Sequence, residues 1–385
     1  MKRYKHLFEK VISLGNLYLA DRKARQGKEA SYGVQLHDKD RDAHLLALHD
    51  ALLTKTFRTS QYDIFTIFEP KERIIYRLPY FPDRIVHHAI MNVLEPIWSR
   101  IYTYNTYSCI KGRGIEGCAR QVEKNIRHFR KSEHLYCLKI DIKKFYPSIR
   151  HDVMKRIVRR SIADKDLLWL LDEIIDSASM NTDGTPRKGS SAMPDAHGLP
   201  IGNYISQSLA NLVLCYFMHW CNTSLADEVR KALHLQAKPN IRVTEYADDI
   251  VFYSDDKAAL HEVMHFIRKP IEADLLLTIK GNWQVFPVAD NRFDCHGRAL
   301  DYVGYKFFRH QKLIRKTTKH NYCKAVSLLE HREHVTFKIF KQTLSPWLGW
   351  LSHSNSRNLL KTTIKNHRFY ENLLNTKAFR SGSSR

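Results

Sequence analysis

The apolar and polar residues of this chain follow two spacings in turn, one helical and one strand-like. The first 55 residues carry apolar positions at helical spacing, for example Leu45 and Leu52, within an otherwise charged segment, which predicts amphipathic helices. Short apolar runs at 62–68 and 73–78 then predict two strands. A helix is expected to follow at about residues 83–101.

The middle of the chain continues this interleaving. An apolar run at 135–140 predicts a buried strand, and helical spacing resumes near residue 150. A stretch rich in Ser, Asp, Gly and Pro at 177–197 predicts a loop. The other expected elements are a helix at 167–175, a long apolar helix that ends near 222, strands at 241–244 and 250–253, a helix at 258–273, a strand-like run at 275–279, and a hairpin around 302–305.

Beyond residue 317 the spacing is helical throughout. The pattern therefore predicts an α+β fold, in which helices surround a small, mostly antiparallel sheet, followed by an all-helical module. That module is basic, with 15 Lys and Arg against 3 acids in residues 311–385. Over the whole chain the formal net charge is +22, which favours a nucleic acid as partner, although a soluble basic face would have the same composition.

Other features of the composition exclude several functional classes. No stretch approaches about 18 consecutive apolar residues, and the N-terminus lacks the apolar core of a signal peptide, so membrane attachment is not expected. The seven cysteines are scattered and form no Cys-x-x-Cys pair, which is typical of reduced thiols in a cytoplasmic protein and argues against a zinc site.

The tetrapeptide 246–249, which ends in Asp248 and Asp249, lies between two of the apolar runs and is expected at the tip of a hairpin. Two adjacent carboxylates with apolar flanks repel each other, unless a divalent cation binds there. A hard cation such as Mg²⁺ takes oxygen ligands and leaves positions open for substrate phosphates. A solvated turn is the alternative explanation for the motif.

A third carboxylate, Asp141, ends the strand predicted at 135–140, and Tyr146 follows it by five residues. An acid and an aromatic in this arrangement match the metal-binding strand of template-directed polymerases. In the two-metal mechanism, acids from two strands hold two ions about 4 Å apart, one at the primer 3′-hydroxyl and one at the leaving pyrophosphate. Asp141 and the Asp248-Asp249 hairpin together are therefore more specific than either alone.

These residues form part of a series that resembles the ordered motifs of reverse transcriptases, over residues 57–358. Residues 77–86 resemble the fingers motif whose basic residues hold the nucleotide and the template, and 108–114 resemble the next fingers motif. Asp141 and Tyr146 resemble the first palm motif, and 246–249 the catalytic hairpin. A further segment resembles the primer grip, namely Tyr302, Val303, Gly304 and Tyr305.

The resemblance implies a right-hand polymerase fold. Residues 57–316 would form the fingers and palm, which contain the small sheet, and residues 317–378 a basic helical thumb. A helical N-terminal extension would occupy residues 1–56, and residues 379–385 a disordered tail.

The resemblance also implies roles for single residues. Asp141, Asp248 and Asp249 would be the catalytic acids and, with the carbonyl of Ile142, the metal ligands. The nucleotide would contact Arg73, Arg77, Arg84, Phe145, Tyr146, Ile201, Gly202, Gln207 and Lys280. Several alternatives stay open: a hairpin cap for Asp249, a core position for Tyr146 and more so for Phe145, a surface ion pair for each arginine, and a solvated strand end for Lys280.

The segment from Gly198 to Gln207 points to one subgroup. Most reverse transcriptases have Gln at the place of Ile201 and Pro at the place of Gln207. The form found here is similar to that of diversity-generating retroelement enzymes. These reverse transcriptases occur in bacteria and phages and belong to the group II intron-like lineage. Those enzymes copy a template RNA and misincorporate opposite adenine.

A physical reason links Ile201 to low fidelity. A Gln can hydrogen-bond the nucleotide sugar, whereas Ile offers only apolar contact, so discrimination that depends on a polar contact is lost. One such bond is worth roughly 1 kcal/mol, or several-fold in selectivity. Simple packing of Ile201 beneath the sheet, with fidelity set elsewhere, is the alternative.

The function expected from the sequence is that of an RNA-directed DNA polymerase with adenine-directed misincorporation. Its cofactors would be two Mg²⁺ ions, with Mn²⁺ as a substitute. Its partners would be template RNA, the RNA/DNA hybrid, dNTPs and a small basic helical accessory protein. The alternatives are a defence-associated or retron-type bacterial reverse transcriptase and a catalytically inactive RNA-binding scaffold. Retention of the three clustered acids argues against the scaffold.

Overall fold

The computed structural model describes residues 3–364 except 69–71, 182, 188–194 and 333. The helices are α1 (Phe8–Ile12), α2 (Leu14–Arg25), α3 (Tyr32–Asp38), α4 (Arg41–Leu53), η1 (Tyr80–Arg84), α5 (Ile85–Ile101), α6 (Gly114–His128), α7 (Phe145–Ser148), α8 (His151–Ser161), α9 (Lys165–Asp176), α10 (Tyr204–Thr223), α11 (Leu225–Ala232), α12 (Lys257–Arg268), η2 (Lys269–Asp274), α13 (Lys316–Glu330), α14 (Phe337–Ser352) and α15 (Arg357–Ile364). The strands are β1 (Asp63–Phe68), β2 (Glu72–Arg77), β3 (Tyr136–Asp141), β4 (Arg242–Tyr246), β5 (Asp249–Ser254), β6 (Gln284–Pro287), β7 (Leu300–Tyr302), β8 (Tyr305–Phe307) and β9 (Lys312–Ile314).

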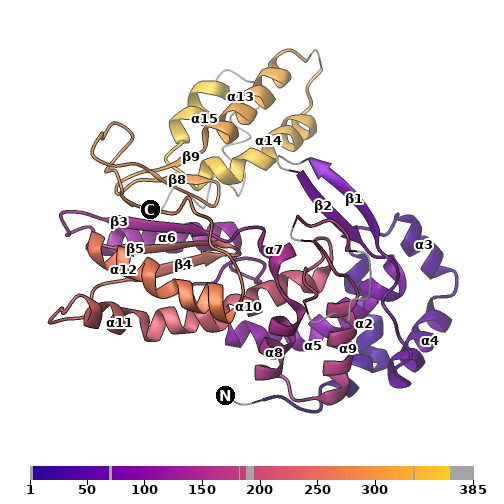
Figure 1. The fold of residues 1–385 in the computed structure, drawn as a ribbon. Coiled ribbons are helices and arrows are strands. Elements are labelled where there is room, and N and C mark those ends of the chain that lie inside the picture. Colours follow the sequence, from indigo (N-terminus) through magenta and orange to yellow (C-terminus); the bar gives the residue numbers. More distant parts are fainter. Residues whose placement is uncertain (1–2, 69–71, 182, 188–194, 333, 365–385) are drawn as a thin grey trace.

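The strands of the described residues form three small antiparallel sheets, which confirms the predicted α+β class. The largest has the order β4-β5-β3-β6, the second is the β1-β2 hairpin, and the third has the order β7-β8-β9. In Figure 1 the helices α10 to α12 lie on one side of the largest sheet and the helices α13 to α15 lie beyond its other side.

The central strand β3 contributes to a different hydrophobic core on each of its faces. Leu138 and Ile140 belong to the larger core, which they share with residues of α5, α8, α10 and α12. Cys137 points to the other face and belongs to a second core with residues of α6, the β7-β9 sheet and the last three helices. Since side chains alternate along a strand, two packed faces fix the register of β3 strongly.

The first four helices do not form a core of their own. Val11, Leu17 and Leu45 are fully buried and belong to the same larger core as Ile90 and Leu94 of α5. The N-terminal extension expected at residues 1–56 is therefore packed into the body of the protein, on the side of α5.

The turn between β7 and β8 is pressed against the helix α14. Gly304 has a φ of +87°, and a Cβ added to it would lie 2.4 Å from the ring of Trp350. The neighbouring Tyr305 ring has its centroid 4.9 Å from that of Trp350. Only glycine fits this turn, because any side chain would meet both an unfavourable backbone angle and the indole ring.

Two parts of the sequence-based expectation need correction. Residues 275–279 do not form a strand, because Leu276 has a left-handed φ of +56° that interrupts the extended run. They make a single bridge between Ile279 and Ile142. The strand that pairs with β3 on the side away from β5 is β6, which the pattern did not predict. The helices α6 and α11 were also not predicted.

The tail expected at residues 379–385 lies outside the described residues. Among the described helices, none combines the length and the apolar character that a membrane crossing requires.

The close contact of Gly304 makes a prediction about stability. Gly304→Ala is expected to lower the free energy of unfolding by about 2 kcal/mol, because the methyl group overpacks against Trp350 and the residue keeps a strained φ. Urea unfolding monitored by circular dichroism measures this. Gly349→Ala is the control with opposite sign: it lies inside α14 with open space around it, and should stabilise by up to about 1 kcal/mol. Equal effects of the two substitutions would contradict the prediction.

Candidate active site

The three acids selected from the sequence meet at one end of the β3-β5 pair. Asp141 ends β3 and lies directly opposite Asp249, which begins β5. Asp248 precedes it in the turn from β4, where Ala247 has a left-handed φ of +55°. The backbone N–H of Ile142 donates to the carbonyl of Asp248 at 3.3 Å, which ties the turn to the end of β3. The antiparallel register therefore brings together carboxylates more than 100 residues apart in the sequence.

Burial and mutual repulsion disfavour ionisation of Asp248 and Asp249. Burial raises the pKa of Asp248 to about 6, and the charge of Asp249 adds to the effect. Burial is also the first cause of the raised pKa of Asp249, which Lys139 partly opposes. The ammonium of Lys139 lies 3.4 Å from a carboxylate oxygen of Asp249.

Lysine ammonium groups supply the counter-charge in this arrangement. Lys280 lies 2.6 Å from Oδ1 of Asp141, and its backbone N–H donates to the Asp141 carbonyl at 2.9 Å. Oδ1 of Asp141 is buried and accepts no well-aligned hydrogen bond from the described residues. The clustered carboxylate oxygens of the three acids fit a hard divalent cation, which prefers such ligands and would replace the ammonium at Asp141.

A pocket of about 270 Å³ adjoins Asp248 on the side of α7 and α10. It brings together six further residues that the sequence selected, namely Arg73, Phe145, Tyr146, Ile201, Gly202 and Gln207. Phe145 is 2% exposed and belongs mainly to the core, as its alternative reading proposed, whereas Tyr146 is only partly buried. The other lining residues are Lys144, Pro147, Pro200, Asn203 and Ser206.

The backbone of β2 packs against Ile201 and Gly202, two residues that line this pocket. The N–H of Tyr76 donates to the carbonyl of Ile201 at 2.9 Å. Gly202 has a φ of +118°, and a Cβ there would lie 2.8 Å from the carbonyl oxygen of Tyr76. The glycine is therefore required for the close approach of the two segments.

Two of the selected arginines lie elsewhere. Arg77 forms an ion pair with Asp63 across the β1-β2 hairpin, and its guanidinium lies 5.2 Å from the centroid of the Phe65 ring. Arg84 lies near the N-terminal helices. Burial is the main cause of the lowered pKa of Lys28 there, and the charge of Arg84 is the second. Neither arginine lines the pocket among the described residues.

The hairpin expected at 302–305 touches the acidic cluster directly. The hydroxyl of Tyr302, which is fully buried, donates to the carbonyl of Asp249 at 2.8 Å. The ammonium of Lys139 lies 5.7 Å from the centroid of the same ring. Val303 and Gly304 form the turn with left-handed φ values, and Tyr305 returns into β8.

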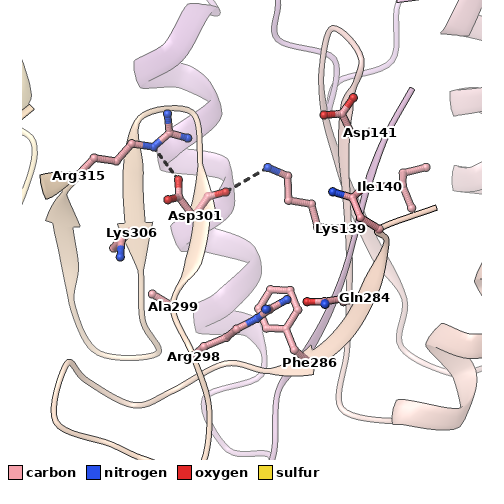
Figure 2. Close-up of a pocket in the computed structure, with 11 residues that line it drawn as sticks. Lys139, Ile140, Asp141, Gln284, Phe286, Arg298, Ala299, Asp301, Lys306 and Arg315 are labelled. Carbon is pink, nitrogen blue, oxygen red and sulfur yellow. Dashed lines mark hydrogen bonds and ion pairs between the residues drawn. The ribbon is translucent and has the colours of Figure 1, made fainter. Parts of the chain in front are cut away.

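A second cavity, of about 520 Å³, lies on the other side of Asp141, between the β3-β6 edge and the β7-β9 sheet (Figure 2). Its lining includes four cations, Lys139, Arg298, Lys306 and Arg315. Arg298 lies over the Phe286 ring, 3.9 Å from its centroid. Arg315 pairs with Asp301 at 2.6 Å. The sequence analysis missed Arg298, Lys306 and Arg315, although basic residues on both sides of the hairpin were a usable signal.

The sequence profile described as "Reverse transcriptase (RNA-dependent DNA polymerase)" matches residues 69–280, which is more than half of the chain. This chain belongs to the reverse transcriptase family. The match includes the acidic cluster and the pocket beside it. By family the protein is an enzyme, an RNA-directed DNA polymerase, and reverse transcriptases generally use divalent metal ions.

Individual relatives show how far the similarity extends. The chain is 23% identical to Protein YkfC of Escherichia coli (strain K12) over 281 residues, which is 68% of each protein. It is 25% identical to the Retron Ec73 reverse transcriptase of Escherichia coli over 56% of this chain and 58% of the relative. Nuclear intron maturase 4, mitochondrial, of Arabidopsis thaliana is 22% identical over 48% of this chain but only 22% of the relative.

Among solved structures, apo telomerase from Candida Tropicalis aligns over 76% of this chain with a TM-score of 0.47 and 12% identity. The aligned part spans about half of the telomerase chain, at 52%. This structural likeness is too low to add to the family assignment.

The raised pKa of Asp248 predicts a stability cost for this acid in the absence of metal. The pKa of about 6 in the folded state lies above the ordinary value for an aspartate. Ionisation of Asp248 therefore costs stability as the pH rises from about 4 to 6, the cost is complete above about pH 6, and it vanishes below about pH 4. Asp248→Asn is therefore expected to raise the free energy of unfolding by about 1–2 kcal/mol at about pH 8. Urea unfolding in a chelator, at about pH 8 and about pH 4, measures the difference.

The control is Asp255→Asn, which changes an acid that follows β5 and accepts a hydrogen bond from Ser132. This variant should show no gain at either pH. A gain for Asp248→Asn that persists at about pH 4 would show that charge is not its cause.

Proposed function

We propose that this reverse transcriptase copies a template RNA into cDNA with frequent misincorporation opposite adenine, as the enzyme of a diversity-generating retroelement. One observation carries the proposal: the apolar side chain of Ile201 lines the pocket beside the acids, together with Tyr146 and Gln207. A pocket with Ile at this place has no side-chain hydrogen bond to offer the nucleotide there, so the polar contribution to selectivity is absent.

Catalysis would depend on Asp141, Asp248 and Asp249 as ligands of two Mg²⁺ ions, or of Mn²⁺, with the carbonyl of Ile142 as a further ligand. When bound, the ions would activate the primer hydroxyl and neutralise the charge of the leaving pyrophosphate. The ammonium of Lys280 now pairs with Asp141. Once a cation bound this carboxylate, the ammonium would be released and would move toward the pyrophosphate. There it would serve as a proton donor.

The pocket beside Asp248 would hold the incoming dNTP. Tyr146 would lie under the sugar and exclude a 2′-hydroxyl by its bulk, and Gly202 and Gln207 would form the wall next to Ile201. Arg73 would bind phosphate oxygens, because it lines the pocket and has no ion pair among the described residues. Arg77 and Arg84 would contribute to the surroundings of the fingers rather than to this pocket.

The primer end would lie on the opposite side of the acids. Asp141 lines the larger cavity of Figure 2 and Asp248 lines the nucleotide pocket, so the acids stand between the two. The four cations of the larger cavity suit the backbone phosphates of a primer strand, and the 302–305 hairpin would be the primer grip. Residues 57–316 would act as fingers and palm, and residues 317–378 as a thumb.

The catalytic roles make a direct prediction. Asp141→Asn should reduce extension of a primer on an RNA template by about 1,000-fold or more, because one metal ligand and its charge are lost. The control is Asp152→Asn, an exposed acid of α8 that pairs with Arg150. Activity of Asp141→Asn within ten-fold of the unchanged enzyme would refute the assignment and revive the scaffold alternative.

The fidelity proposal predicts the pattern of errors. Sequencing of cDNA made from the cognate RNA should show substitutions concentrated at template adenines. Ile201→Gln should lower these errors several-fold, since it restores one hydrogen bond worth roughly 1 kcal/mol. Ile241→Gln, at a half-buried position before β4, is the matched control and should leave the spectrum unchanged. Evenly distributed errors or faithful copying would argue against a diversity-generating role.

A second candidate function is that of a retron-type or defence-associated reverse transcriptase. The similarity to the Retron Ec73 reverse transcriptase favours it. The two functions differ in what accompanies the gene: a repeat pair and a small basic helical accessory protein would support diversification. Primer extension with and without that small protein tests whether the enzyme depends on it.

A further inference from the structure

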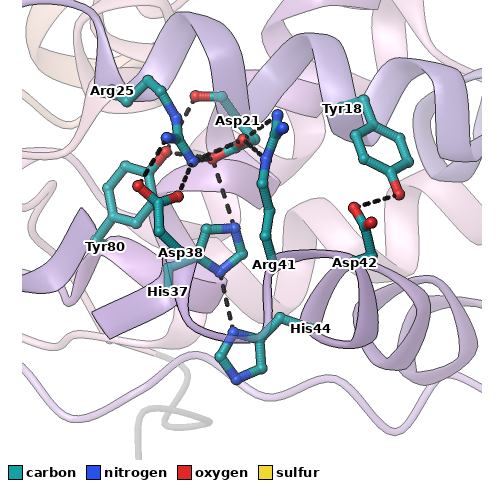
Figure 3. Close-up of polar contacts among 9 residues, drawn as sticks. All are labelled: Tyr18, Asp21, Arg25, His37, Asp38, Arg41, Asp42, His44 and Tyr80. Atoms are coloured by element: carbon teal, nitrogen blue, oxygen red, sulfur yellow. Dashed lines mark hydrogen bonds and ion pairs between the residues drawn. The ribbon is translucent and has the colours of Figure 1, made fainter. Parts of the chain in front are cut away.

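A fully buried carboxylate, Asp21, fastens the N-terminal helices to one another (Figure 3). The guanidinium of Arg25, also on α2, donates to both of its oxygens at 3.0 Å. Nε of Arg41 on α4 donates to Oδ2 at 2.7 Å. Burial opposes ionisation, but the hydrogen bonds of the cluster lower the pKa of Asp21 below its usual value. The carboxylate is therefore a charged hub within the fold.

The same carboxylate reaches out of the N-terminal helices to Tyr80. The Tyr80 hydroxyl donates to Oδ1 of Asp21 at 2.5 Å and lies 3.0 Å from the Asp21 backbone carbonyl. Tyr80 is the first residue of η1, in the segment that connects β2 to α5. The ring is buried, so this contact fixes the corner at which the chain leaves β2.

That corner lies close in sequence to the wall of the nucleotide pocket. β2 ends at Arg77, three residues before Tyr80, and carries Arg73 on the pocket lining. The N–H of Tyr76 bonds to the carbonyl of Ile201, and Gly202 approaches the same strand without room for a Cβ. A displacement of β2 would therefore act directly on these contacts.

The β1-β2 hairpin needs such an anchor because it has only two strands, and an isolated two-stranded hairpin is marginally stable in water. Most of its residues are exposed. The hairpin gains support from the rest of the protein where Tyr76 meets Ile201 and where the Tyr76 hydroxyl donates to the carbonyl of Gly184 at 2.9 Å. Asp21 holds the chain immediately beyond the hairpin.

We propose that Asp21 is a positioning residue for the incoming nucleotide: through Tyr80 it holds β2, and with it Arg73, against Ile201 and Gly202. The N-terminal helices then take part in nucleotide binding without touching the nucleotide. This inference rests on the proposed role of the pocket as the dNTP site.

The test is the dNTP dependence of primer extension by Tyr80→Phe, which removes only the hydroxyl that reaches Asp21. We expect the KM for dNTP to rise about five- to ten-fold, the size of effect that the loss of one ordinary hydrogen bond produces, with kcat within about two-fold. Asp21→Asn, which keeps an oxygen able to accept from Tyr80, should show a smaller rise than Tyr80→Phe. All measurements are made at a temperature where thermal unfolding shows each variant to be folded.

The matched control is Tyr18→Phe. Tyr18 also belongs to α2, but its hydroxyl donates to an acid of α4, Asp42, at 2.8 Å instead of reaching Asp21. This variant should have the same KM for dNTP as the unchanged enzyme. A KM for Tyr80→Phe equal to that of Tyr18→Phe would overturn the proposal, even if Tyr80→Phe melted at a lower temperature.

Amide hydrogen exchange separates this inference from the proposed function. In Tyr80→Phe the amide of Tyr76, which bonds to Ile201, should exchange faster than in the unchanged protein, whereas amides within α10 should not. This readout needs no catalysis. If the unchanged protein failed to extend primers, the proposed function would be refuted. Faster exchange of the Tyr76 amide in Tyr80→Phe would still support the coupling between Tyr80 and β2. If extension were normal and neither KM nor exchange changed, only the coupling would fall.

Discussion

Repulsion among three half-buried carboxylates is the constraint around which this structure is organised. Asp141, Asp248 and Asp249 lie close together, and burial disfavours the charge on the last two. Lys139 and Lys280 offset part of this cost without removing it. Such an arrangement persists only because the surrounding sheet is held from both sides, by one hydrophobic core behind it and a second in front.

The acidic cluster also divides the space around it. A pocket lined by Tyr146 and Ile201 adjoins Asp248, and a separate cavity lined by Arg298, Lys306 and Arg315 adjoins Asp141. A polymerase must bring two substrates to one set of metal ligands from different directions. The geometry offers two separate recesses beside the acids, one small and partly apolar, the other strongly cationic, and this supports the proposed function.

Much of this arrangement could be predicted from the sequence, because the signals were local. The apolar runs on either side of Asp248 and the run before Asp141 predicted strands that the structure contains. What could not be predicted depended on contacts between distant segments. Arg77 matches a motif by position, yet its partner across the hairpin is Asp63. Residues 275–279 read as a strand, but one left-handed residue, Leu276, ends the extended run. The helix α6 was missed although Cys118, Val122 and Ile126 carry helical spacing.

The packing of Trp350 against Gly304 joins the last helices to the 302–305 hairpin, and that hairpin in turn bonds to Asp249 through Tyr302. A rigid-body rotation of these helices alone would separate packed residues of a continuous hydrophobic core that extends from α14 to the central sheet. In the proposed role of these helices as a thumb, adjustment to nucleic acids of different width would proceed by small sliding movements in which helices and hairpin move as one body. The proposed function then implies that the depth of a bound duplex and the position of its terminal nucleotide would be mechanically linked.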